Sequence, residues 1–284
     1  SPDRSRIEMA ALMTDTAPAR SALLERLVTK AGGVRSEATI QSDVRMLLLD
    51  PELGLAEEDL DVQLEAQVGR GRRIDVEVGC TVIEVKKSLT SPAVVTAAID
   101  QLTDYVQTRA AEMGQRYVGI LTDGEIWIAF HEVDGALREA TRHKATTGPA
   151  GGTALLRWLE GVLATKRAVR PTPTEIAQRL GASSSSHALD YSTLAALYAD
   201  SRDQPTVVLK RELWANLLRS ALGTQFTNSD DLFLEHTLLV NSAEIIAHLV
   251  LGLNAEELSP ATLLSGAQFS IAGLHGVVDR DFFD

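Results

Sequence analysis

The sequence has little cysteine, few aromatic residues and no long apolar run. Cys80 is its single cysteine, which excludes an internal disulfide and a zinc site built on paired cysteines. No apolar run approaches the roughly 18 residues that a membrane helix requires, and the first residues lack the pattern of a signal peptide. With 45% hydrophobic and 23% charged residues, the composition predicts a globular, cytoplasmic protein without a membrane partner. We expect Cys80 to be a strand residue rather than a reactive thiol.

The three tryptophans and the two spaced histidines of the C-terminal part give no sign of a binding platform. Trp127, Trp158 and Trp214 are far apart in the sequence, so we expect them in hydrophobic cores rather than in a base-stacking surface. His236 and His248 are twelve residues apart on one predicted helix and out of phase by about 120°, which argues against a shared metal ion.

Positive charge is also scarce, since the formal net charge is -12. This argues against a protein that coats nucleic acid over its whole surface, because neutralising phosphates requires a local density of Lys and Arg. The charge is uneven, however: residues 52–65 carry six acidic side chains and no basic one, whereas residues 138–170 carry seven basic and two acidic ones. The second stretch is either a phosphate-binding surface or an ordinary solvated one.

Hydrophobic periodicity predicts an α/β domain followed by helices. Apolar residues recur at helical spacing in some segments and alternate in others, and glycine, proline and aspartate separate these segments. We predict helices at 17–31, 36–49, 92–113 and 155–163, strands at 62–68, 74–78, 81–85, 117–122 and 125–130, turns at 69–73 and 123–124, and a loop at 148–152. Both residues of the Asp123-Gly124 turn are expected to have positive φ.

The length of the chain suits two domains. We predict an α/β domain over residues 1–168, a linker region with a short helix over 169–190, and a small all-helical domain over 191–284. Proline residues and the serine run at 183–186 mark the linker region, and the segments after it show helical spacing only.

Acidic and basic side chains gather on the predicted hairpin at residues 74–85. Asp75 lies on its first strand, and Glu84 and Lys86 lie on the second, where residues two apart share a face. A tight turn would bring Asp75 alongside Glu84, and two facing carboxylates repel each other unless a cation lies between them. Such hard oxygen ligands suit Mg²⁺. The pattern predicts a metal site, with Glu77 as the second-ranked ligand on the Asp75 face.

Hydrolysis of a phosphodiester bond is the chemistry that fits this site. Mg²⁺, for which Mn²⁺ can substitute, polarises a phosphate and activates water, while Lys86 orients that water or offsets developing negative charge. Gln101 and Tyr105 are four residues apart on the following helix, so they share one face and could reach a bound phosphate. The alternative is an exposed charged hairpin packed by an ordinary helix.

Over roughly residues 20–165 this arrangement resembles the PD-(D/E)XK nuclease superfamily, in the RecB-like subgroup with an added Gln-x-x-x-Tyr motif. The resemblance implies a restriction-endonuclease-like mixed sheet flanked by helices. It also implies that Asp75 and Glu84 are metal ligands, that Lys86 is the catalytic lysine, and that Gln101 and Tyr105 are an accessory pair.

The same family often adds an acidic residue from a preceding helix. Glu37 is the position that we assign to this catalytic and metal-binding role, with Asp43 and Glu65 less favoured. Ile74 stands where the family usually has a proline, which is a tolerated departure.

The helical part is similar to the connector between nuclease and methyltransferase in type IIG restriction-modification enzymes. The similarity lies in residues 231–240, and residues 278–283 resemble the segment that precedes their methyltransferase domain. The chain has neither an Asn-Pro-Pro-Tyr tetrad nor a glycine-rich cofactor loop. The resemblance therefore implies a fragment whose methyltransferase and target-recognition regions lie outside this chain.

From the sequence we thus expect a Mg²⁺-dependent endonuclease for double-stranded DNA, which would pair into a dimer to cut both strands. Two alternatives stay open: a non-catalytic DNA-binding module of the same fold, and a helical interaction scaffold, which the acidic net charge favours slightly. The expected DNA contacts are Arg70, Arg72, Arg73, Lys87, Arg142 and Lys144.

Overall fold

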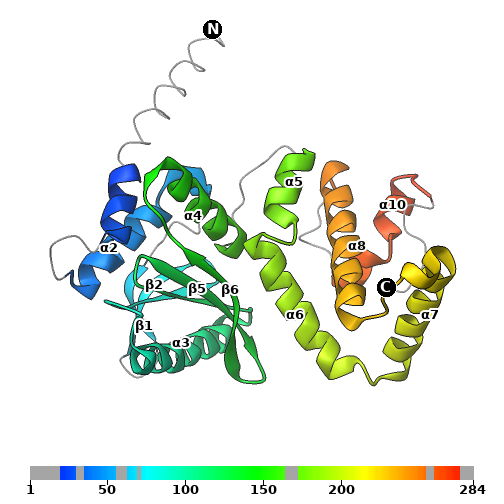
Figure 1. Ribbon diagram of the computed structural model, residues 1–284, viewed down its shortest axis with the longest axis horizontal. Coiled ribbons are helices and arrows are strands. Elements are labelled where there is room, and N and C mark those ends of the chain that lie inside the picture. The colour runs from blue at the N-terminus through cyan, green and yellow to red at the C-terminus, as the bar shows by residue number, and fades with distance from the viewer. Residues whose placement is uncertain are drawn as a thin grey trace, which may run out of the picture. The chain divides into compact units, whose positions relative to one another are not determined.

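A computed structural model describes residues 20–29, 35–55, 63–68, 72–163, 172–253 and 259–275 of the chain (Figure 1). The chain divides into two compact units, residues 1–189 and 190–284. The first unit is an α/β structure with a mixed sheet flanked by helices, and the described part of the second is helical. Among the described helices, none is both long enough and apolar enough to cross a membrane.

Six strands form one sheet in the order of the sequence. They are β1 (Gln63–Val68), β2 (Arg72–Val78), β3 (Thr81–Val85), β4 (Val118–Thr122), β5 (Ile126–Val133) and β6 (Ala136–Lys144). β3 and β4 are parallel and all other neighbours are antiparallel. Parallel neighbours need a long crossover, which helix α3 (Pro92–Met113) provides. Strand β6 was not predicted, because its charged, half-exposed side chains suit a sheet edge and hide the apolar alternation.

The two Asp-Gly pairs of the sheet behave differently. Asp134 and Gly135, between β5 and β6, have φ values of 52° and 77° and form the tight turn with two positive φ angles. At the predicted turn only Gly124 has a positive φ, 87°, so the expectation of a positive φ at Asp123 was wrong. Asp123 stabilises this turn through its side chain instead, since its Oδ1 accepts hydrogen bonds from the backbone N–H groups of residues 125 and 126.

Capping residues mark two of the predicted helix boundaries, at residues 36 and 114. A helix covers residues 20–28, and α2 (Glu37–Leu48) begins after Ser36, whose side chain accepts a hydrogen bond from the Thr39 N–H at 3.2 Å. A 3₁₀ turn at Pro51–Leu53 follows α2. Helix α3 ends at Gly114, which has a φ of 65° and suits the left-handed cap.

Helix α4 (Gly148–Leu163) includes the glycines that were expected to form a loop, so that expectation was wrong. Close packing accounts for these glycines. A Cβ atom at Gly151 would lie 2.1 Å from the carbonyl oxygen of Thr146, and one at Gly152 would lie 2.4 Å from Cδ1 of Leu24. Glycine lowers helix propensity here but lets α4 approach its neighbours.

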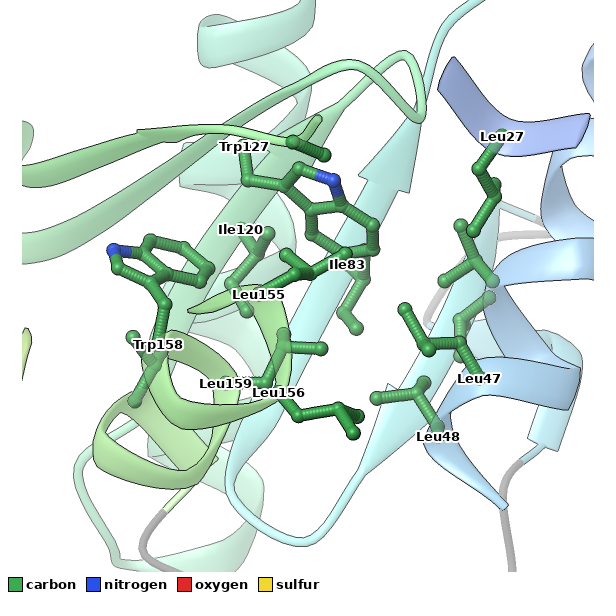
Figure 2. Close-up of a cluster of buried hydrophobic side chains, with 14 of the residues drawn as sticks. Leu27, Leu47, Leu48, Ile83, Ile120, Trp127, Leu155, Leu156, Trp158 and Leu159 are labelled. Atoms are coloured by element: carbon green, nitrogen blue, oxygen red, sulfur yellow. The ribbon is translucent and has the colours of Figure 1, made fainter. Parts of the chain in front are cut away.

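Hydrophobic side chains cover both faces of the sheet. In Figure 1, α2 and α4 lie on one side of the sheet and α3 on the other. Figure 2 shows the larger cluster, in which Trp127 packs edge-to-face against Trp158 at 6.5 Å between ring centroids. Each fully buried leucine or isoleucine side chain in this cluster contributes about 1.5–3 kcal/mol to the free energy of unfolding. Leu102 and Val106 of α3 are buried in the second cluster, as their helical spacing predicted.

The region expected as a linker is folded against the first unit. It contains α5 (Pro173–Leu180) and the beginning of α6 (Ser185–Ser201). The hydroxyl of Ser185 donates to the carbonyl of Trp158 at 2.7 Å, and Arg179 forms an ion pair with Glu160. The division between the two units thus falls inside α6.

The second unit packs around aromatic side chains of α7 (Pro205–Leu222) and α8 (Asp230–Val250), followed by α9 (Pro260–Leu264) and α10 (Ala267–Ile271). Trp214 is buried, as expected, and lies 5.2 Å from the ring of Phe233. The two histidines have different neighbours: His236 accepts a hydrogen bond from the Trp214 indole, whereas the His248 ring lies against Phe269.

The glycine packing of α4 generates a stability prediction. Gly151→Ala should lower the free energy of unfolding by about 1–3 kcal/mol because of overpacking, although alanine favours helices by about 1 kcal/mol. Ala154→Gly, at an exposed position of the same helix, should cost no more than about 1 kcal/mol. Chemical denaturation measures both values, and a stabilised Gly151→Ala variant would contradict the packing argument.

Candidate active site

The β2–β3 hairpin brings Asp75 and Glu84 together at the end of the sheet. The strands pair antiparallel around a turn in which Gly79 has a φ of 50°, with Val76 opposite Ile83 and Glu77 opposite Val82. The side chain of Asp75 crosses to the neighbouring strand, where its Oδ2 accepts a hydrogen bond from the Val85 N–H at 2.8 Å. The register thus places the two carboxylates side by side, as the sequence predicted.

Glu84 is fully buried although it carries a carboxylate. Every residue of β3 is buried, and the side chain of Glu84 is 1% exposed. Burial, followed by the charges of Asp75 and Glu37, raises the pKa of Glu84 to about 7, against the opposing effect of Lys86. Its Oε2 atom is buried and accepts no hydrogen bond from the described residues. Buried carboxylate oxygens in proteins normally accept at least one hydrogen bond, so this oxygen is an exception.

Lys86 links the carboxylates to helix α3. Its ammonium forms an ion pair with Oε1 of Glu84 and donates to Oε1 of Gln101 at 3.4 Å. The amide of Gln101 in turn donates to the hydroxyl of Tyr105 at 2.9 Å. Burial opposes the charge of Lys86, but Glu84, Asp75 and Glu37 outweigh it and raise the pKa of the ammonium. The Gln-x-x-x-Tyr pair therefore meets the hairpin, as its helical spacing predicted.

Glu37 joins the same group from the first turn of α2. Its Oε1 accepts a hydrogen bond from the Lys87 N–H at 3.3 Å, and its charge acts on both Glu84 and Lys86. The structure therefore brings together Glu37, Asp75, Glu84, Lys86, Gln101 and Tyr105, which the sequence had assigned to one site.

The competing carboxylates have other partners. Glu77 accepts hydrogen bonds from Arg109 and, at 3.3 Å, from the Tyr117 hydroxyl. Asp43 forms ion pairs with Arg26 and Arg35. The side chain of Glu65 lies outside the described residues. Neutralisation by arginine explains physically why Glu77 and Asp43 are weaker candidates for metal binding than Asp75 and Glu37.

The donor set fits a divalent cation that keeps part of its water shell. Among the residues that the structure describes, no three histidine, cysteine or carboxylate side chains are already arranged around a common metal position. Mg²⁺ does not require such a cage, because it is often held by one or two carboxylates together with water and substrate phosphate. The unpartnered Oε2 of Glu84 beside the carboxylate of Asp75 supplies oxygen ligands of that kind.

Asp123 and Thr122 are positioning residues that the sequence analysis did not find. The carbonyl of Thr122 accepts a hydrogen bond from the Lys86 N–H at 2.9 Å, and Oδ2 of Asp123 accepts one from the Leu89 N–H at 3.0 Å. Asp123 is 5% exposed. In the sequence, an Asp-Gly pair after a strand indicates only a turn. The hydrogen bond from Leu89 to Asp123 arises because β3 and β4 pair in parallel, which brings their carboxyl ends together.

The expected DNA contacts differ in their surroundings. Arg142 pairs with Glu139, and Lys144 pairs with Glu125 at 3.3 Å. Lys87 is exposed and forms no ion pair with any residue that the structure describes. Arg70 and the side chains of Arg72 and Arg73 lie outside the described residues.

Cys80 lies in the turn between β2 and β3 and is exposed, so the expectation of a strand residue was wrong. Its thiol donates a hydrogen bond to Oε1 of Gln115 at 3.0 Å. The turn comprises residues 79 and 80, between the end of β2 and the beginning of β3.

The burial of Glu84 predicts how stability depends on pH in the metal-free protein. A carboxyl whose pKa is about 7 in the folded state and 4.5 in solution stabilises the fold at low pH, and this stabilisation is lost as the pH rises through 7. The loss amounts to about 3 kcal/mol. We expect the free energy of unfolding, measured with a chelator present, to fall between pH 5 and pH 8 in the parent chain.

Glu84→Gln is the matched variant, because an amide of the same shape does not titrate. Its unfolding free energy should change less with pH than that of the parent chain over the same interval. Parallel curves for the two proteins would show that Glu84 does not titrate in this range.

Models of known protein families, curated proteins and solved structures contain no match to this chain. The function of the site must therefore be argued from its own residues and geometry.

Proposed function

We propose that the first unit is a Mg²⁺-dependent DNA endonuclease of the PD-(D/E)XK superfamily, with a restriction-endonuclease-like fold. The observation that carries the proposal is the buried, unpartnered Oε2 of Glu84, on a carboxylate whose other oxygen pairs with Lys86 and which also feels the charge of Asp75. Such an arrangement of like and opposite charges costs stability and is typical of functional sites. The Gln101–Tyr105 pair supports the assignment to the Gln-x-x-x-Tyr subgroup.

The residues of the chain have separate roles in this reaction. Asp75 and Glu84 would hold the metal ion, with Glu37 contributing from α2. When bound, the metal ion supplies the Lewis acid that polarises the scissile phosphate and lowers the pKa of water. Lys86 holds a positive charge beside Glu84, where it can donate to a phosphate oxygen or orient the attacking water.

Gln101 and Tyr105 act on Lys86. Tyr105 is 3% exposed, and its hydroxyl accepts a hydrogen bond from the amide of Gln101. Because the amide group donates to the tyrosine, its oxygen faces Lys86, at 3.4 Å from the ammonium. The pair thus orients the ammonium group and is a positioning element in our proposal.

The whole enzyme would be a cytoplasmic restriction-modification or phage-defence protein. In this proposal a methyltransferase and a target-recognition region complete it, and the helical second unit is the connector. One such centre cuts one strand, so cleavage of both strands of DNA would require a second copy of the chain. Sequence recognition would reside outside the residues of this site.

Plasmid cleavage with Mg²⁺ or Mn²⁺ tests the proposal. Asp75→Asn and Lys86→Ala should each lower the rate of nicking by about 100-fold or more, because the first removes a metal ligand and the second a positive charge at the reacting phosphate. Mg²⁺ binding, measured by calorimetry, should be weakened by Asp75→Asn and retained by Lys86→Ala.

Glu77→Gln is the matched control for Asp75→Asn, because the two carboxylates are two residues apart on β2 and Glu77 is already held by Arg109. This variant should retain its nicking rate within about threefold. A parent chain that binds no Mg²⁺ contradicts the proposal, and metal and DNA binding without any cleavage would favour a non-catalytic DNA-binding module.

Tyr105→Phe tests the positioning role of the accessory pair. Removing the hydroxyl leaves the Gln101 amide without its acceptor, so we expect kcat to fall roughly tenfold while the affinity for Mg²⁺ stays unchanged. Gln101→Ala should have a similar effect, and the double variant should be no worse than either single one, because the two residues act as a unit.

Tyr117→Phe provides the control, since its hydroxyl likewise forms a side-chain hydrogen bond, but donates it to Glu77 rather than accepting one from Gln101. Its kcat should match that of the parent chain. Additive losses from Tyr105→Phe and Gln101→Ala would contradict the proposed coupling.

A further inference from the structure

A cavity of about 420 Å³ opens beside the catalytic cluster and has no role in the chemistry described above. Glu37 and Lys87 belong to the lining of the cavity, and Glu37 also acts electrostatically on Glu84 and Lys86. The Lys87 N–H donates a hydrogen bond to Oε1 of Glu37, and this bond connects the cavity with the candidate active site. The cavity therefore lies next to the position of the scissile phosphate in the proposed reaction.

The lining of the cavity has an apolar and a polar part. Leu27, Ile40 and Val94 provide aliphatic walls, from the helix over residues 20–28, from α2 and from α3. The polar part comprises Lys87, Ser88 and Thr90 together with Arg35 and two acidic residues, Glu37 and Asp123. The two carboxylates already accept backbone hydrogen bonds, from Lys87 and Leu89. A few polar groups within mainly apolar walls, in a volume between about 300 and 1,000 Å³, are typical of small-molecule sites.

The polar part of the lining favours an anion. The ammonium of Lys87 forms no ion pair with the part of the chain that the structure describes. The 22-residue helix α3 begins at this cavity with Ser91 and Val94, and Ser91 does not cap the helix with its side chain. The positive end of the helix dipole thus adds to the charge of Lys87.

The segment that carries these groups is held in place. Asp123, itself part of the lining, accepts a hydrogen bond from Leu89 N–H, and the Thr122 carbonyl accepts one from Lys86 N–H. Arg35, another residue of the lining, is fixed by an ion pair with Asp43. Groups that are fixed before binding lose little conformational entropy when a ligand arrives.

We infer that this cavity binds one unpaired nucleotide of the DNA substrate. The phosphate would lie at Lys87 and the beginning of α3, and the sugar and base would lie against Leu27, Ile40 and Val94. A base inside a duplex is stacked and paired, so it must leave the helix to enter such a cavity. This inference rests on the proposed function and adds a preference for DNA with an unpaired nucleotide beside the cut.

Deoxyadenosine monophosphate is the probe that tests the cavity without metal or cleavage. In the methyl-labelled full chain, dAMP should shift the NMR signals of Leu27, Ile40 and Val94. Inorganic phosphate should bind roughly tenfold more weakly, because it lacks the apolar part of the ligand. Lys87→Ala should weaken dAMP binding roughly tenfold, since a hydrogen bond to a charged phosphate is lost, whereas Lys210→Ala, on α7 of the second unit, should leave it unchanged.

Val94→Trp should fill the cavity and abolish the dAMP response. Val208→Trp is the matched control, because both valines lie on helices and are similarly exposed, at 39% and 40%. The control keeps the response and the fold. Equal responses in the two variants, or equal affinities for phosphate and dAMP, would overturn the inference.

Asp75→Asn separates this inference from the proposed function. Asp75 does not line the cavity, so the variant should bind dAMP as the parent chain does while it loses cleavage. A chain that cleaves DNA but does not respond to dAMP overturns the nucleotide cavity and leaves the endonuclease intact. A chain that responds to dAMP but does not cleave DNA overturns the endonuclease proposal instead.

Discussion

The burial of the Glu84 carboxylate is the constraint on which the site depends. Glu84 lies near the end of β3, an inner strand whose residues are all buried, and its carboxylate has a second carboxylate beside it. Water cannot stabilise this charge, so the surrounding structure must do so. The ion pair with Lys86 satisfies one oxygen, and the other oxygen has no partner among the described residues. In the proposed function, a divalent cation would correct that imbalance.

Helix α3 determines how the two acidic residues of β2 differ. Gln101, Tyr105 and Arg109 are spaced four residues apart, so they share one face of the helix. Arg109 neutralises Glu77, whereas Gln101 contacts Lys86 beside Asp75 and Glu84. One helix face therefore holds the carboxylate of Glu77 in an ion pair and leaves that of Asp75 near Lys86 in the candidate site. Strand β2 alone does not distinguish Asp75 from Glu77, because residues two apart on a strand lie on the same face.

The β4–β5 turn connects the candidate active site with the cavity. Thr122 and Asp123 hold the backbone of Lys86 and Leu89, so a single short segment supplies the lysine of the site, the polar part of the cavity and the start of α3. Because β4 is parallel to β3, their carboxyl ends meet at the same edge of the sheet. This is the edge at which open α/β sheets commonly place their ligand sites.

The sequence by itself determined the chemistry-bearing residues and most elements, because strand alternation, helical spacing and capping residues are local signals. It placed Asp75 and Glu84 on adjacent strands, Lys86 next to Glu84 at the end of the second strand, and Gln101 and Tyr105 on one helix face. Only the tertiary structure decided that β6 is a strand, that the glycines of α4 are helical, and that Asp123 holds the segment after Lys86. These features arise from pairing and packing between residues far apart in the chain, and no local pattern contains that information.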